Sequence, residues 1–145
     1  MFTTWGGQMT HPNEDLLREG YAAFGRGDLD ALQNRFFAED IRWHYPGKSP
    51  FGGDFEGIAE VIDWLGRTFA TSGGTIRLEL HDVLANDDHA VALVRVRAER
   101  PGEQLDDRSV QVFHVRDGKA TEAWTYPADQ YASDAFWSVT AKDGL

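Results

Sequence analysis

A single acidic side chain lies on a predicted strand face that is otherwise apolar. Residues 75–85 alternate two sets of side chains, with Ile76, Leu78, Leu80 and Asp82 on one face and Arg77, Glu79 and His81 on the other. If the apolar face lines a cavity, burial penalises the charged form of the Asp82 carboxylate. A carboxyl group held in this way can act as a general acid or base. Asp82 is therefore a candidate catalytic residue, and the alternative is a solvated or arginine-paired side chain at the edge of the sheet.

Hydrogen-bonding side chains accompany aromatic ones on other predicted strands. Tyr45 ends a strand over residues 39–45, and Gln111 lies within a strand over residues 105–116. Both could donate hydrogen bonds to an oxygen that gains negative charge during a reaction, so both are candidate catalytic residues. The faces turned to the same cavity supply the candidate substrate-binding residues, which are Trp43, Leu80, Phe113 and Thr125. An apolar lining with a few polar groups suits a small hydrophobic molecule.

Two histidines stand on the opposite faces of these strands. His44 precedes a glycine-rich loop over residues 46–57, and His81 directly follows Leu80. A β-bulge at either place would turn the imidazole toward the cavity. We therefore include His44 as a candidate catalytic residue and His81 as a candidate substrate-binding residue, and the alternative for each is a surface or interface position. No histidine pair has the spacing of a metal site, so neither a metal nor an organic cofactor is predicted.

The composition excludes several classes of partner and chemistry. The chain has 145 residues, with 14 Lys and Arg against 24 Asp and Glu, and a formal net charge of −10. This balance argues against nucleic acids and anionic membranes as partners, since both need a basic protein surface. The lack of cysteine excludes disulfides and thiol chemistry. No apolar run reaches the ~20 residues of a membrane span, and no signal-peptide pattern is present, so a cytoplasmic protein is expected.

Apolar spacing predicts the elements that would position these residues. Helices are expected where apolar side chains recur at helical spacing, over residues 13–25, 29–36, 58–72 and 128–138. Alternating patterns predict strands over residues 39–45, 75–85, 89–99, 105–116 and 119–126. Asp117 and Gly118 have the residue types of a type I′ turn, which joins the last two strands as a hairpin.

This order of elements predicts an α+β fold in which a curved antiparallel sheet wraps around three N-terminal helices. The enclosed cone would leave a cavity, and its mouth is a natural ligand site. The expected organisation is a flexible N-terminal tail over residues 1–12, a single domain over 13–138 and a C-terminal tail over 139–145. The helix at 128–138 would either cover the mouth as a lid or pack as part of the core.

Five segments carry a resemblance to a known superfamily. They are GRGDLDAL at 25–32, FFAEDIRWHYPG at 36–47, GDFEGIAEVIDWL at 53–65, FHVRDGKATEAW at 113–124 and YPADQY at 126–131. In their order and spacing they resemble the nuclear transport factor 2-like (NTF2-like) superfamily, and within it the SnoaL-like polyketide cyclases and the ketosteroid isomerases. The resemblance covers roughly residues 13–137 and implies the NTF2-like cone, a fold that hosts both enzymes and noncatalytic binders.

The acids and bases of these relatives are replaced at the matching positions. The general base of ketosteroid isomerases falls at Tyr45, and their first-helix tyrosine falls at Gly20. Their protonated aspartate and the histidine of SnoaL-like cyclases both fall at Gln111, and the cyclase aspartate falls at Thr125. The resemblance therefore implies neither steroid isomerisation nor the SnoaL aldol cyclisation by the residues that these families use.

Two functions of the cavity remain open at this point, and a third alternative is an interaction scaffold that uses the exposed sheet face. One is a cofactor-free acid/base enzyme, of the isomerase, cyclase, dehydratase or epoxide-opening type, acting on a small hydrophobic metabolite. The other is a noncatalytic protein of the same fold that binds such a molecule. A homodimer through the outer sheet face is also expected, because Val91, Leu93, Trp124 and Tyr126 would otherwise form an exposed apolar patch.

Overall fold

The computed structural model describes residues 3–5 and 8–138 of the chain. Within them the helical elements are α1 (Pro12–Gly25), α2 (Leu29–Ala31), the π-helical turn η1 (Leu32–Phe36), α3 (Ile58–Thr71) and α4 (Gln130–Trp137). The strands are β1 (Thr3–Trp5), β2 (Gln8–Thr10), β3 (Phe37–Tyr45), β4 (Gly53–Glu56), β5 (Arg77–Ala85), β6 (His89–Arg100), β7 (Glu103–Arg116) and β8 (Lys119–Pro127). The expected C-terminal tail over residues 139–145 lies outside the described residues.

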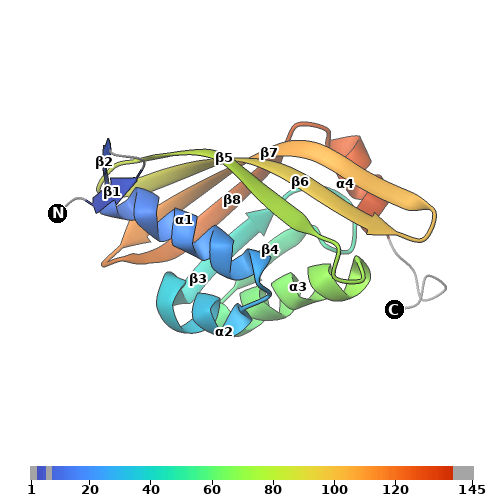
Figure 1. Cartoon of the computed structure of the whole chain (residues 1–145). Coiled ribbons are helices and arrows are strands. Elements are labelled where there is room, and N and C mark those ends of the chain that lie inside the picture. Colours follow the sequence, from blue (N-terminus) through green and yellow to red (C-terminus); the bar gives the residue numbers. More distant parts are fainter. Residues whose placement is uncertain (1–2, 6–7, 139–145) are drawn as a thin grey trace.

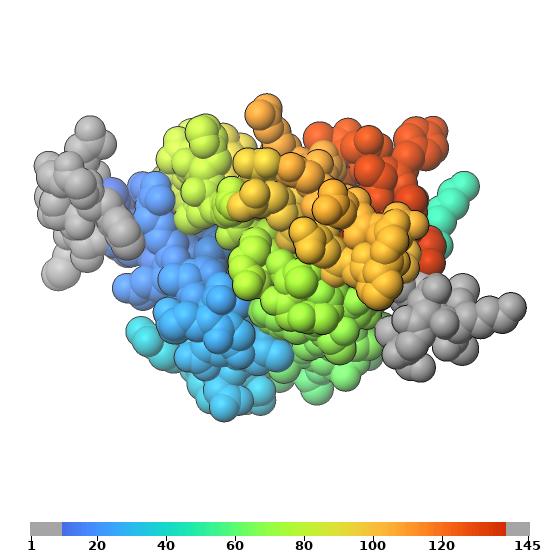
Figure 2. All heavy atoms as spheres, turned by 45° about the vertical axis from the view of Figure 1, so that its right-hand side comes forward, coloured from blue at the N-terminus to red at the C-terminus, as the bar shows by residue number. Residues whose placement is uncertain are grey.

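The main sheet is open, curved and mixed. Its strand order is β4-β3-β8-β7-β6-β5, with β3 parallel to β8 and every other neighbouring pair antiparallel. Figure 1 shows α1 and α3 on the concave side of the sheet, beneath strands β5 to β8. In Figure 2 the atoms of α1, of β5 with the end of α3, and of the β6–β7 hairpin meet on one face of the molecule. The predicted α+β class, with a curved sheet around the N-terminal helices, is confirmed, but the sheet is mixed and not wholly antiparallel because β3 runs parallel to β8.

The helices form where the apolar spacing predicts them. α1 buries Leu17, Ala23 and Phe24 on one side, and α3 buries Val61, Trp64, Leu65 and Thr68. Asp28 accepts a hydrogen bond from the amide nitrogen of Ala31 at 3.0 Å and so caps the short helix α2. These buried faces pack on the concave side of the sheet around a core in which Ile41 is fully buried.

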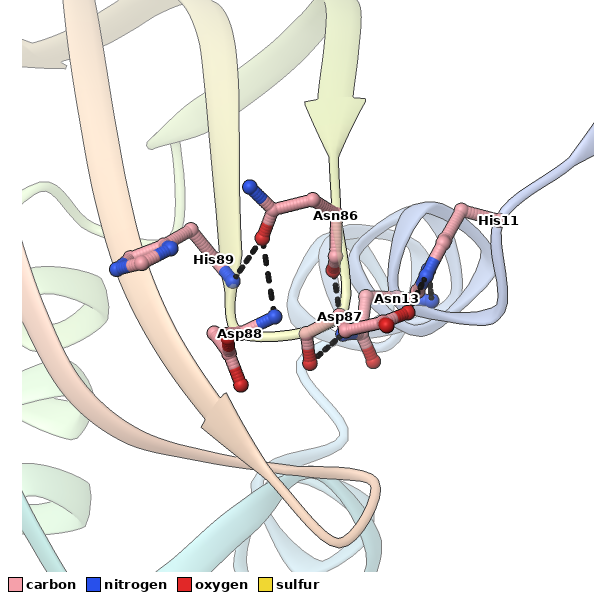
Figure 3. A network of polar contacts seen from close by, with 6 residues as sticks. All are labelled: His11, Asn13, Asn86, Asp87, Asp88 and His89. Carbon is pink, nitrogen blue, oxygen red and sulfur yellow. Dashed lines mark hydrogen bonds and ion pairs between the residues drawn. The ribbon is translucent and has the colours of Figure 1, made fainter.

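The N-terminus of α1 is fixed to the turn between β5 and β6 (Figure 3). His11 Nδ1 accepts a hydrogen bond from the amide nitrogen of Asn13 at 3.0 Å, and His11 Nε2 lies 2.7 Å from Asp87 Oδ1. The Asn13 side chain donates to the carbonyl oxygens of Asn86 at 2.9 Å and Asp87 at 3.0 Å. These hydrogen bonds join the start of α1 to the β5–β6 turn, so the network sets where α1 crosses the sheet.

The edge strand β5 contains a bulge. Leu80 pairs with Val94, but Asp82 pairs with the adjacent Leu93, so His81 is an extra residue in the ladder. Alternate side chains of a strand lie on opposite faces of the sheet. One extra residue therefore moves each later side chain of the strand to the opposite face. Val83 is accordingly buried, whereas Asp82 is exposed.

Three segments differ from the sequence-based expectation, and the first is the helix expected over residues 29–36, which consists of α2 and the π-helical turn η1. Gly53–Glu56 forms the strand β4, which pairs with the end of β3, although its glycines predicted a loop. Thr3–Trp5 and Gln8–Thr10 pair as a two-stranded sheet inside the segment expected to be a tail. Among the helices of the described residues, none is long and apolar enough to span a bilayer.

Candidate functional site

An interior cavity of about 110 Å³ lies between the concave face of the sheet and helices α1, α3 and α4. Its walls are largely aromatic, and the rings come from Tyr21, Phe24, Phe36, Phe37, Trp43, Tyr45, Phe51, Trp64, Phe113 and Trp137. The polar side chains among its lining are Thr68, Asp107, Ser109, Gln111, Thr125 and Ser133. An apolar protein cavity of about 150 Å³ can hold benzene, and this space is somewhat smaller but of the same order of size.

Trp43 forms the centre of the aromatic wall. Its ring centroid lies 5.4 Å from that of Trp64 and 5.5 Å from that of Phe113, the latter edge to face. The buried indole Nε1 donates a hydrogen bond to Thr125 Oγ1 at 2.9 Å, so the one polar atom of this ring has a partner. Because β3 and β8 are neighbours in the sheet, this bond fixes the ring across two strands.

Tyr21 and Gln111 form a polar pair in the cavity lining. The Tyr21 hydroxyl on α1 donates a hydrogen bond to Gln111 Oε1 on β7. Burial raises the pKa of the Tyr21 phenol well above its usual range, so this group stays protonated and remains a donor at neutral pH. Tyr21 follows Gly20, the position at which the resemblance aligned the first-helix tyrosine of ketosteroid isomerases.

Tyr45 joins the cavity wall to α4. Its hydroxyl lies 2.9 Å from Ser133 Oγ, and both residues line the cavity. Burial raises the pKa of Tyr45, and the negative charges of Asp134 and Asp107 raise it further. Tyr45 is therefore a neutral hydrogen-bonding group at physiological pH. The last helix takes part in both of the roles left open for it, because Ser133 and Trp137 line the cavity while Phe136 and Trp137 are buried in the core.

Asp107 is the charged residue of the cavity lining. It lies on the same face of β7 as Ser109 and Gln111, and its side chain is partly exposed. Its Oδ2 accepts a hydrogen bond from the amide nitrogen of Asp129 at 3.0 Å, just before α4 begins. This hydrogen bond holds the Asp107 carboxylate at the end of the cavity that α4 covers.

Two buried polar atoms of the lining have no hydrogen-bond partner among the described residues. They are Ser109 Oγ and Trp64 Nε1, and their residues are only 6% and 4% exposed. Leaving such a group unpaired costs about 1–3 kcal/mol, so both are places where a polar atom of a bound molecule would be stabilised.

The structure places five of the predicted site residues on the cavity wall, namely Trp43, Tyr45, Gln111, Phe113 and Thr125. Asp82 is not among them, and the expectation that it faces the cavity is wrong. The bulge at His81 turns Asp82 outward, where its side chain is 55% exposed, lies 3.5 Å from Arg18 and accepts a hydrogen bond from the amide of Val83. Leu80 precedes the bulge and packs against the core, but it does not line the cavity.

Neither of the two candidate histidines reaches the cavity. His44 lies on the outer face, where Nδ1 is 2.7 Å from Asp54 Oδ1 and Nε2 is 2.6 Å from Glu122 Oε2. Its ring also stacks on Trp124. The hydrogen bond with Asp54, followed by that with Glu122, raises the pKa of His44. His81 is the bulged residue and is exposed, so the bulge moved Asp82 outward without bringing His81 inward.

Some of the cavity residues that the sequence analysis did not identify could have been found from the pattern of the sequence. Asp107 and Ser109 share the strand parity of Gln111 and Phe113, so extending that pattern toward the start of β7 would have found both. Ser133 belongs to α4, and its place against Tyr45 depends on how the helix docks. No group of three histidine, aspartate or glutamate side chains within the described part of the chain is arranged to hold a metal ion.

The fold and the cavity define a class of protein, an α+β cone with an aromatic interior of the NTF2-like type. Within that class the chain belongs to the family of SnoaL-like domains, whose model matches residues 17–123. It is 40% identical to the uncharacterized protein Rv0034 of Mycobacterium tuberculosis over 125 residues, which are 86% of this chain and 95% of that protein.

Two solved structures extend the likeness to three dimensions. Bal32a, from a soil-derived mobile gene cassette, is 36% identical with a TM-score of 0.84 over 87% of this chain and 96% of its own. An NTF2-like protein of unknown function from Burkholderia pseudomallei is 27% identical with a TM-score of 0.76 over 90% of this chain and 100% of its own. The resemblance found in the five sequence segments is thus confirmed.

Proposed function

We propose that this protein binds a small hydrophobic molecule in the aromatic cavity. The observation that carries the proposal is an apolar space of about 110 Å³, whose lining residues include Ser109 and Trp64, each with a buried polar atom that has no partner among the described residues. An unpaired buried polar atom lowers the stability of a protein, so apolar side chains would be expected at these positions if they only filled the core. Tyr21, Gln111 and Tyr45 supply further hydrogen-bonding groups that could orient the molecule.

Native mass spectrometry of the protein as purified tests this proposal. We expect a mass excess from a bound small molecule, or uptake of added toluene. Val96→Phe enlarges a side chain of the lining and should abolish either one, whereas Val110→Phe on the outer face should leave binding unchanged. A wild-type protein that carries no molecule and takes up no toluene would contradict the proposal.

A second candidate function is acid/base conversion of the bound molecule. It is favoured by Asp107, because a carboxylate beside the neutral Tyr45 hydroxyl provides a base and a hydrogen-bond donor in an otherwise apolar space. Isomerisation, cyclisation, dehydration or epoxide opening would each need these groups and no cofactor. Conversion of the bound molecule by wild type but not by Asp107→Asn would support this function. An unchanged molecule over hours would support binding alone.

We also propose that the protein forms a homodimer through its outer sheet face. The apolar side chains on this face are Leu84, Val91, Leu93, Val110, Val112, Trp124 and Tyr126, in cross-strand rows over β5 to β8. Leu84, Val110 and Tyr126 are 57%, 37% and 54% exposed. Charged pairs border the patch, such as Arg95 with Asp106 at 2.7 Å. An apolar centre with a polar rim is typical of a protein interface, and a second copy fits it by symmetry.

A further inference from the structure

We infer that the molecule bound in the cavity carries a protonated amine, which pairs with the Asp107 carboxylate and the Ser109 hydroxyl. The inference rests on the proposed binding function and adds the chemical class of the ligand. It follows from the charge, the geometry and the aromatic surroundings of one end of the cavity.

The cavity lining that the structure describes carries a negative charge and no positive charge. Asp107 is the acidic residue of the lining, and no lysine, arginine or histidine is among the lining residues that the structure describes. Asp107 also forms no ion pair with any described residue. A carboxylate beside an apolar space is stabilised by a cation and destabilised by a second anion. The free energy of this arrangement favours a cationic ligand over a neutral one and a neutral ligand over an acid.

The geometry leaves one carboxylate oxygen for the ligand. Asp107 Oδ2 accepts the hydrogen bond from the Asp129 amide, which fixes the group and leaves Oδ1 without a hydrogen-bond partner among the described residues. Ser109 lies two residues along the same strand face, roughly 6.6 Å away at the backbone, and its buried Oγ is unpaired. An ammonium group has several N–H donors, so a primary amine placed between the two side chains can donate to both.

The aromatic walls and nearby charges favour the same ligand class. Aromatic faces attract cations through their quadrupole, and Trp64 and Tyr45 lie with ring centroids 5.3 Å apart on this wall. The charges of Asp134 and Asp107 both act on the Tyr45 hydroxyl and raise its pKa, so two negative charges bear on the same end of the cavity. The hydrophobic body of the ligand would then occupy the remaining space toward Trp43 and Phe113.

Calorimetric titration with probes of nearly equal size tests the inference. The probes are benzylamine, toluene, benzyl alcohol and benzoate, each titrated near pH 7 into wild type, Asp107→Asn and Ser109→Ala. Asp106→Asn is the matched control, since the neighbouring Asp106 lies outside the cavity and pairs with Arg95. Asparagine retains an oxygen for the Asp129 amide, and an unfolding curve for each variant shows that it is folded.

We expect benzylamine to bind about tenfold more tightly than toluene and benzoate to bind most weakly, as one charge-assisted hydrogen bond would produce. Asp107→Asn should remove the preference for benzylamine and leave toluene affinity unchanged. Ser109→Ala should weaken benzylamine binding less strongly, and Asp106→Asn should change no affinity.

Two results would overturn the inference while the proposed function stands. They are toluene binding as tightly as benzylamine in wild type, and an equal loss of both affinities in Asp107→Asn. If no probe binds wild type, the inference and the proposed binding function fail together.

Discussion

The Tyr21 hydroxyl of α1 donates a hydrogen bond to Gln111 Oε1 of β7, so a helix and the central part of the sheet are joined across the cavity. Gln111 is 6% exposed, and the surrounding wall is apolar. Its amide oxygen therefore depends on this donor. The pair therefore ties α1 to β7 at the cavity wall.

Tyr21→Phe removes the donor and leaves the buried Gln111 oxygen unsatisfied. We expect the free energy of unfolding to fall by about 1–3 kcal/mol, the usual cost of an unpaired buried acceptor. Urea denaturation followed by tryptophan fluorescence measures the change. Tyr131→Phe is the control, because Tyr131 is 90% exposed and its loss of a hydroxyl should leave stability unchanged. Equal stability of Tyr21→Phe and wild type would show that the hydrogen bond between Tyr21 and Gln111 does not stabilise the fold.

The sequence predicted the inward face of most strands, and the exceptions have a physical cause. Trp43, Tyr45, Gln111 and Phe113 were placed by alternation alone, which holds as long as the ladder is regular. Asp82 lies one residue beyond a bulge, and residues 79–82 contain no glycine or proline to mark it. A single irregular pairing therefore moved the expected catalytic carboxylate to the surface.

The hydrogen-bond partners of the cavity residues were harder to predict than the side of the sheet on which their side chains lie. Tyr21 falls within the helix predicted over residues 13–25, but its bond to Gln111 depends on where that helix crosses the sheet. That crossing is set by the contacts of His11 and Asn13 with the β5–β6 turn (Figure 3). Contacts between residues so far apart in sequence leave no periodic signal. The bond between Tyr45 and Ser133 was missed for the same reason.

His44 should make the stability of the protein depend on pH. Its pKa is raised in the folded state by the hydrogen bond with Asp54 and then by that with Glu122. The protonated imidazole therefore stabilises the fold. The contribution is complete below the unfolded-state pKa of about 6.5 and is lost as the pH rises through the folded-state value.

His44→Gln should lower the free energy of unfolding at about pH 5.5 by up to about 1 kcal/mol, because these ion pairs are partly exposed. The difference from wild type should shrink at about pH 8.5. Urea denaturation at both pH values measures it, and the same substitution in an Asp54→Asn background should have a smaller effect at the lower pH. A difference that is constant with pH, or that grows toward alkaline pH, would refute the prediction.

Gly47 holds the loop after β3 against α4. Its φ is +108°, which L side chains rarely adopt, and an added Cβ would overlap the Asp134 carboxylate. The same carboxylate accepts hydrogen bonds from the Lys48 amide at 3.2 Å and Gln130 Nε2 at 3.0 Å. A methyl group at this position therefore displaces the Asp134 side chain from these hydrogen bonds.

Gly47→Ala should lower the free energy of unfolding by more than the about 1–3 kcal/mol expected for backbone strain alone. Gly102→Ala provides the comparison, because Gly102 has φ +76° and open space around it. Thermal or urea unfolding of both variants separates the two causes. Equal losses in the two variants would mean that the contact with Asp134 contributes nothing.

The proposed dimer makes a prediction about the outer sheet face. Tyr126→Asp places a charge within the apolar patch and should convert the dimer into a monomer at micromolar concentration. Tyr131→Asp adds the same charge at an exposed position on α4, outside that face, and should leave the dimer intact. Light scattering coupled to size-exclusion chromatography measures both masses. A monomeric wild type, or a dimeric Tyr126→Asp variant, would contradict the proposed interface.

The proposed binding function depends on a small molecule entering the space between Trp43, Trp64 and Ser109. A crystal of the protein soaked with bromobenzene would locate such a molecule through the anomalous scattering of bromine. The proposal predicts a bromine peak inside the cavity, within contact distance of these aromatic rings. Bromine found only on the outer sheet face, or a cavity closed by its own side chains in the soaked crystal, would contradict it.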